Sequence, residues 1–76
     1  MSEVADKVRG LIASVYRVKV DDLGDDVVLN DISNRSVLLV GLISMLEDEF
    51  DITVPLDEMP GDITIGGVIA LVESKL

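Results

Sequence analysis

Ser36 is the residue of this 76-residue chain whose position most suggests chemistry, because a polar stretch ends there and the aliphatic run 37–43 begins. A serine hydroxyl acts as a nucleophile only when a neighbouring base activates it. The chain contains no histidine and no cysteine, and no lysine or acid is evidently paired with Ser36. The sequence therefore favours a serine that is modified over a serine that catalyses. Serine is also a preferred helix cap, so a purely structural role for Ser36 stays open.

The charge balance of the chain is strongly acidic, with 15 aspartates and glutamates against 6 lysines and arginines and a net charge of -9. Neutralising phosphates needs a basic face, so nucleic acid is not expected as a partner. The absence of cysteine excludes both a disulfide framework and a thiolate zinc site. The sign of the charge favours a basic protein partner, because opposite charges speed the encounter of two proteins.

A chain of this length has room for one domain, placed at residues 1–76, with one small hydrophobic core. Its longest apolar run, 37–43, is much shorter than the ~20 residues that cross a bilayer, so no membrane span is predicted. The first residues lack the basic and apolar regions of a secretory signal. We therefore expect a cytoplasmic protein, and we expect it to be a monomer.

Apolar residues recur at helical spacing in three stretches, which predict helices over about residues 3–16, 36–50 and 65–75. Residues 17–35 form a long connection, whose apolar members we expect to pack over the core. Residues 56–59 have room for one short turn of helix before a proline–glycine pair. The predicted fold class is therefore all-α.

The same periodicity predicts which side chains form the core, and Ser2 and Thr64 are the expected caps of the first and last helices. The predicted core positions are Val4, Val8, Leu11, Ile12, Val15, Leu39, Leu42, Ile43, Leu46, Phe50, Ile65, Val68, Ile69, Val72 and Leu76.

The acidic stretch 21–26 in the long connection raises the possibility of calcium binding. Its glycine and its distal glutamate are misplaced for an EF-hand loop, so a solvated acidic loop is the favoured interpretation. Two short runs in the connection, 18–20 and 27–29, are considered as strands, but each is too short to build a sheet alone, and no partner strand is evident.

The outward face of the helix predicted at 36–50 carries two aliphatic residues, Val37 and Val40, which we expect to be exposed. The carboxyl end of this helix is crowded by the acids Glu47, Asp48, Glu49 and Asp51. Negative charge at that end opposes the helix dipole and costs a few tenths of a kcal/mol. Solubility and recognition by a basic partner both explain these acids, and the residues alone do not separate the two explanations.

The run Leu46-Glu47-Asp48-Glu49-Phe50-Asp51-Ile52-Thr53-Val54-Pro55, with Ser36 ten residues before it, resembles the modified helix of acyl carrier proteins. The resemblance covers nearly the whole chain, although the family's Asp-Ser-Leu motif is here Arg35-Ser36-Val37. It implies a four-helix carrier-protein bundle with a long first loop and a short third helix. It also implies phosphopantetheine covalently bound to Ser36 and a non-enzymatic carrier of acyl thioesters, in fatty acid, polyketide or other lipid metabolism.

The partners that the resemblance implies are a phosphopantetheinyl transferase and acyl-transferring and chain-elongating enzymes with basic docking surfaces. Two alternatives remain: an aminoacyl or peptidyl carrier of the same fold, and an acidic interaction module without a prosthetic group. We hypothesise that Arg35 selects the transferase, since transferases of the fatty-acid type generally meet their carriers through basic surface. In the alternative, Arg35 is solvated and contributes nothing. The predicted contact residues are Arg35, Val37, Val40, Glu47, Asp48 and Asp51.

Overall fold

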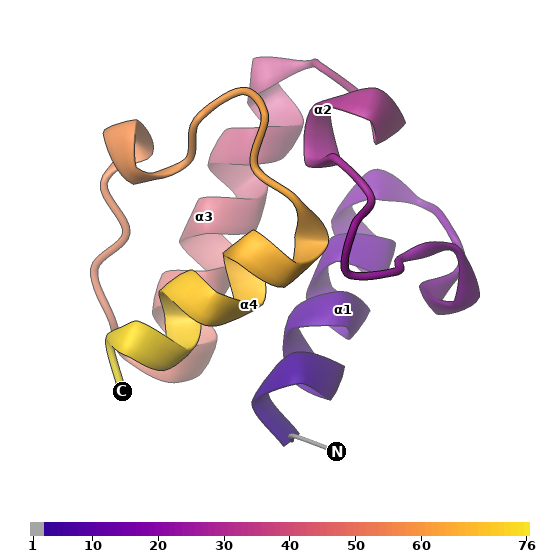
Figure 1. The fold of residues 1–76 in the computed structure, drawn as a ribbon. Coiled ribbons are helices and arrows are strands. Elements are labelled where there is room, and N and C mark those ends of the chain that lie inside the picture. Colours follow the sequence, from indigo (N-terminus) through magenta and orange to yellow (C-terminus); the bar gives the residue numbers. More distant parts are fainter. Residues whose placement is uncertain (1–2) are drawn as a thin grey trace.

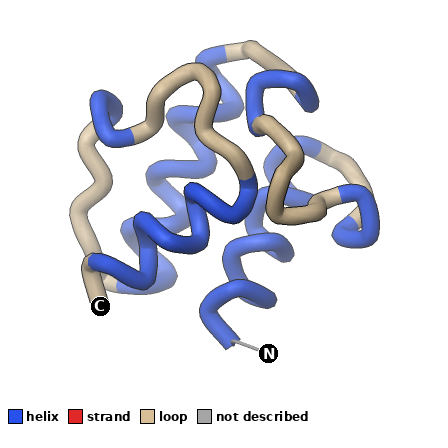
Figure 2. The backbone as a smooth tube through the Cα atoms, viewed as in Figure 1, coloured by secondary structure: helices blue, strands red, loops and turns tan. Residues whose placement is uncertain are grey.

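Four α-helices and two single turns of 3-10 helix make up the regular structure of residues 3–76, the part of the chain that the computed structural model describes (Figures 1 and 2). No strand is present in these residues, so the all-α prediction is confirmed. No helix among them is both long and apolar enough to cross a membrane. The elements are α1 (Glu3–Tyr16), the turn η1 (Val20–Asp22), α2 (Leu29–Ile32), α3 (Ser36–Phe50), the turn η2 (Leu56–Glu58) and α4 (Ile65–Ser74).

One hydrophobic cluster holds these elements together, and every α-helix and both longer connections contribute to it. Eight of the predicted core positions are buried, six more pack partly buried against them, and the prediction for Leu76 is wrong. No polar or charged side chain is buried within residues 3–76. The buried side chains are Val8, Ile12, Tyr16, Leu23, Leu29, Leu42, Leu46, Val54, Met59, Ile65, Val68, Ile69 and Val72.

Helices α1 and α3 pack side by side and run in opposite directions. Lys7 near the start of α1 pairs with Glu49 near the end of α3, at 3.3 Å between Nζ and Oε2. Gly41, in the first half of α3, lies close to Val15 near the end of α1: a methyl group placed on Gly41 would be 4.0 Å from Cγ1 of Val15. Helix α4 passes in front of α3 in the view of Figure 1 and packs against α1. This packing leaves one side of α3 without a neighbouring helix.

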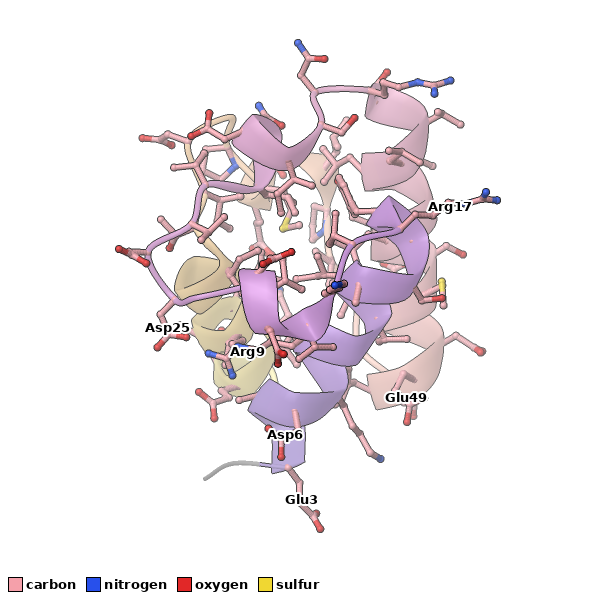
Figure 3. All side chains as sticks on the ribbon, turned by 90° about the vertical axis from the view of Figure 1, so that its right-hand side faces the viewer. Glu3, Asp6, Arg9, Arg17, Asp25 and Glu49 are labelled. Carbon is pink, nitrogen blue, oxygen red and sulfur yellow. The ribbon has the colours of Figure 1, made fainter. Side chains whose placement is uncertain are left out.

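The long connection 17–35 is folded onto the core rather than loose. Leu23 and Leu29 bury their side chains, as expected for a packed connection. Arg9 of α1 fixes its middle: Nε donates to the Leu23 carbonyl at 3.0 Å, and the guanidinium pairs with the Asp25 carboxylate (Figure 3). The connection therefore delivers the chain to the start of α3 along a defined path.

The connection is also bonded to the start of α4. The Leu29 N–H donates to the Ile63 carbonyl at 2.9 Å, and the Ile65 N–H donates to the Val27 carbonyl at 2.8 Å. These bonds surround an isolated antiparallel bridge between Val28 and Thr64. The run 27–29 thus has a pairing partner that the sequence did not reveal, although the pairing is too short to form a sheet.

Thr64 caps α4 as predicted, because its Oγ1 accepts the Gly67 N–H at 3.0 Å. The expected short third helix is a single 3-10 turn, η2, and α4 ends one residue early, at Ser74. Leu76 lies beyond that end and is 66% exposed, so the helical periodicity no longer applies to it. Helix α2 was not predicted, because four residues are too few to display a helical period. The cap predicted at Ser2 falls outside the described residues.

Candidate functional site

Ser36 is the first residue of the 15-residue helix α3, and it is exposed. Its hydroxyl has no hydrogen-bonding partner among residues 3–76, so it is free to react and no base activates it. The cap position of α3 is Arg35, whose side chain makes no capping bond. The structural alternative, in which Ser36 serves only as the helix cap, is therefore not supported by its position.

The first turn of α3 leaves backbone donors beside the Ser36 hydroxyl. The Leu38 and Leu39 N–H groups both donate to the Arg35 carbonyl, at 3.1 and 3.4 Å. The N–H groups of Ser36 and Val37 have no acceptor within residues 3–76. Free N–H groups at the positive end of a helix favour a bound anion. A phosphate ester on Ser36 Oγ is therefore compatible with the backbone around it.

Arg35 is held by its backbone and not by its side chain. Its N–H donates to Ser33 Oγ at 3.3 Å, which fixes the residue that precedes the helix. The side chain is exposed, and its guanidinium forms no ion pair with any residue from 3 to 76. The positive charge next to Ser36 is therefore free to meet a ligand or a partner.

The side of α3 without a neighbouring helix carries the predicted aliphatic residues. Val37 is 65% exposed and Val40 is 56% exposed, which confirms the expectation that both face solvent. Gly41 and Met45 border this face, Gly41 where α1 approaches and Met45 with 38% of its surface exposed. The structure thus provides a short apolar strip directly after Ser36.

The four acids at the end of α3 do not all have the same role. Glu47 is half-buried, and its Oε2 accepts the Val54 N–H at 2.8 Å. Glu49 forms the ion pair with Lys7 described above. Asp48 and Asp51 are exposed and form no ion pair within residues 3–76. Of the acids predicted to contact a partner, Asp48 and Asp51 thus have carboxylates free to meet it. The Glu47 carboxylate is also bonded to the backbone at Val54 and so fixes the segment after α3.

The left-handed backbone of Asp51 ends α3. Its φ of 55° is a conformation that aspartate adopts more readily than most residues, and its N–H donates to the Glu47 carbonyl. The chain turns out of the helix at this point, so Asp51 lies at the very end of the exposed face. The sequence placed Asp51 with the other acids but gave no sign of this turn.

Within residues 3–76, no three histidines, cysteines or acids are grouped so that they could hold a metal ion. In the acidic stretch 21–26, Asp25 is engaged by Arg9 and its carbonyl accepts the Gly66 N–H at 2.9 Å. Sequence reasoning missed this role of Arg9 and Asp25, because no local pattern pairs residues that lie 16 positions apart.

Comparison with known proteins agrees with this arrangement. A family model described as phosphopantetheine attachment site matches residues 6–72. The chain is 33% identical over 73 residues to an acyl carrier protein of Lactobacillus acidophilus, covering 95% of this chain and 91% of that protein. It is 28% identical over 74 residues to the non-reducing polyketide synthase pks11 of Talaromyces marneffei, covering 97% of this chain but 3% of the synthase.

These matches imply a covalently attached phosphopantetheine and a carrier role, which is not in itself catalytic. The family model covers most of the chain, and the Lactobacillus protein is matched over nearly its whole length. The chain therefore belongs to the family of phosphopantetheine-bearing carrier domains that includes the acyl carrier proteins.

Proposed function

We propose that Ser36 Oγ is the attachment point of phosphopantetheine and that the chain carries acyl intermediates as thioesters, which it presents to biosynthetic enzymes. The observation that carries this proposal is the exposed hydroxyl of Ser36, which has no hydrogen-bonding partner among residues 3–76, at the first position of a long helix. Another exposed serine of the same helix, Ser44, lies two turns further along and lacks the free backbone donors of the helix start. Ser36 is therefore the better acceptor of a phosphate ester.

When bound, phosphopantetheine supplies a thiol that holds the acyl group as a thioester. The residues of this chain anchor the arm and do no bond-making of their own. Ser36 supplies the ester oxygen, the N–H groups of Ser36 and Val37 can donate to the phosphate, and the Arg35 guanidinium suits its geometry. No residue from 3 to 76 accepts the Ser36 hydroxyl proton, so the transferase must supply the base.

The relatives favour an acyl group as the cargo. The Lactobacillus protein is an acyl carrier protein, and the Talaromyces protein is a polyketide synthase. Both names support carriage of acyl rather than aminoacyl or peptidyl groups, in a fatty acid or polyketide pathway. The chemical identity of the thioester on protein isolated from its host distinguishes these cargoes. An aminoacyl thioester there would contradict the acyl proposal while leaving the attachment at Ser36 intact.

The enzymes that act on the arm are proposed to dock on the side of α3 that has no neighbouring helix, which is called the open side of α3 below. Any enzyme that reaches Ser36 must approach the residues around it, and these include the exposed Val37 and Val40. Asp48 and Asp51 continue the same helix towards its end and attract basic docking surface. Acyl-transferring and chain-elongating enzymes are the partner class that this role requires.

Intact-mass spectrometry tests the attachment directly. The wild-type chain, coexpressed with a broad-specificity phosphopantetheinyl transferase, should gain the mass of one phosphopantetheine. Ser36→Ala should gain none, and the matched control Ser44→Ala, which removes the exposed hydroxyl further along α3, should gain one. An unmodified wild type, or a modified Ser36→Ala variant, would contradict the proposal.

A further inference from the structure

Exposed charges without an ion pair among the described residues have opposite signs at the two ends of α3. Arg35 stands at the amino end with no ion pair among residues 3–76, and Asp48 and Asp51 stand at the carboxyl end, also without one. Asp48 lies 13 positions after Arg35, a distance of about 20 Å along a helix. Val37 and Val40 lie between the two ends, at 65% and 56% exposure. A partner that reaches Ser36 and covers the open side of α3 therefore meets a positive charge beside Ser36, then apolar surface, then negative charge.

The stability of the helix does not explain this order of charges. A helix is stabilised by acids at its amino end and by bases at its carboxyl end. Helix α3 has no acid in its first turn and no base in its last turn, and its free charges have the reverse arrangement. Pairing within the chain does not explain it either, because Arg35, Asp48 and Asp51 form no ion pair within the described residues. Solubility accounts for exposed charges in general but not for this order of signs, whereas recognition by another molecule accounts for both.

We infer that Arg35 and the open side of α3 together form a bipolar docking surface, and that its partner is an enzyme with complementary charges of both signs. This partner presents a carboxylate opposite Arg35, close to the entrance through which it reaches Ser36. It presents an apolar strip to Val37 and Val40, and basic groups about 20 Å away, opposite Asp48 and Asp51. The inference rests on the proposed function, because it concerns the enzymes that act at Ser36.

A bipolar surface differs from a uniformly acidic surface in the partner enzymes that it excludes. An enzyme whose docking surface is basic throughout would place positive charge against Arg35, and that repulsion disfavours its approach. An enzyme with both signs is accepted in one direction only, because reversing it along α3 would oppose like charges at both ends. The surface thereby selects the partner and also fixes the orientation in which Ser36 enters its active site.

Modification rates measured with charge-reversed variants test the inference. A panel of phosphopantetheinyl transferases is assayed with coenzyme A, and the enzyme with the highest kcat/KM on the wild-type chain becomes the probe. With that probe at low ionic strength, Arg35→Asp and Asp48→Lys should each lower kcat/KM, by about fivefold. Arg35→Gln should lower it less, and added salt should reduce all the differences.

Lys19→Asp is the matched control, because Lys19 is an exposed base without an ion pair among residues 3–76 and lies on the connection after α1. It carries the same change of charge as Arg35→Asp and should leave kcat/KM within about twofold of the wild type. An increase or no change in kcat/KM with Arg35→Asp, together with a decrease with Asp48→Lys, would show a uniformly basic partner and overturn the inference. A wild-type chain that no transferase modifies would instead contradict the attachment at Ser36.

Discussion

The Glu47 carboxylate accepts a hydrogen bond from the Val54 N–H at 2.8 Å, which ties the last turn of α3 to the segment that follows it. The backbone carbonyl of the same glutamate accepts the Ile52 N–H at 3.3 Å. Val54 is almost fully buried, so this bond fixes where the chain enters the core again. Glu47 therefore holds the exit from α3, and its negative charge is only partly available to a partner.

Glu47→Ala should lower the free energy of unfolding by about 1–2 kcal/mol, because it leaves the nearly buried Val54 N–H without its acceptor. Glu47→Gln keeps an oxygen acceptor and should lose less. Urea unfolding followed by circular dichroism measures both variants. Asp48→Ala is the control, since Asp48 is exposed and unpaired in the described chain, and its effect should stay within about 0.5 kcal/mol. Equal stability of Glu47→Ala and Asp48→Ala would show that the bond contributes nothing.

The helices with a long apolar period could be predicted from the sequence almost to the residue. The bounds predicted for α1 and α3 agree with the structure, because their apolar residues repeat over several turns. The connection 17–35 could not be predicted in detail. Its path depends on Arg9, Asp25 and the bonds to Ile63 and Ile65, which are contacts between segments distant in sequence. No local pattern encodes such contacts.

Arg9→Ala should lower the free energy of unfolding by about 1–2 kcal/mol, because it removes the bond to the half-buried Leu23 carbonyl and the ion pair with Asp25. Amide hydrogen exchange should also accelerate in the connection, first at the Val27 N–H, which is bonded within it. Arg17→Ala is the matched control. Arg17 is exposed at the end of α1 and has no ion pair among residues 3–76, so its removal should change little (Figure 3). If the two variants unfold alike, Arg9 does not anchor the connection.

In the candidate site, too, features set by local helical geometry could be predicted, and features set by contacts between distant segments could not. Exposure of Ser36, Val37 and Val40 follows from helical geometry, and the sequence predicted it for the two valines. The different roles of Glu47 and Asp48 could not be predicted. Only the position of the Val54 N–H in the folded chain distinguishes the two adjacent acids. A basic partner was expected from the net charge, whereas the free charge next to Ser36 is positive. Net charge thus describes the molecule but not its individual faces.

Tyr16 should make stability depend on pH in the alkaline range. Its side chain is 7% exposed, and burial raises the pKa of its phenol above the usual value of 10.0. Above about pH 10, the unfolded chain loses this proton more readily than the folded chain, so the free energy of unfolding must fall as the pH rises. Tyr16→Phe should flatten that part of the stability profile. Parallel profiles for the two proteins between about pH 9 and 11 would contradict a raised pKa.

Replacing Gly10 or Gly66 by alanine should change the free energy of unfolding in opposite directions. A methyl group on Gly66 would lie 3.1 Å from the carbonyl oxygen and 3.2 Å from the Cβ of Asp25, whereas one on Gly10 would meet nothing within 4 Å. Alanine favours a helix over glycine by up to about 1 kcal/mol. Gly10→Ala should therefore stabilise the protein by about 0.5–1 kcal/mol.

At Gly66 the same gain in helix propensity is opposed by the contact with Asp25, whose carbonyl also accepts the Gly66 N–H. The connection would have to move away from α4 by a few tenths of an ångström, which weakens this bond and strains the ion pair with Arg9. Gly66→Ala should therefore lower the free energy of unfolding by about 1 kcal/mol. Urea unfolding of both variants decides the matter, and stabilisation by Gly66→Ala as large as that by Gly10→Ala would show that the two segments are not in tight contact.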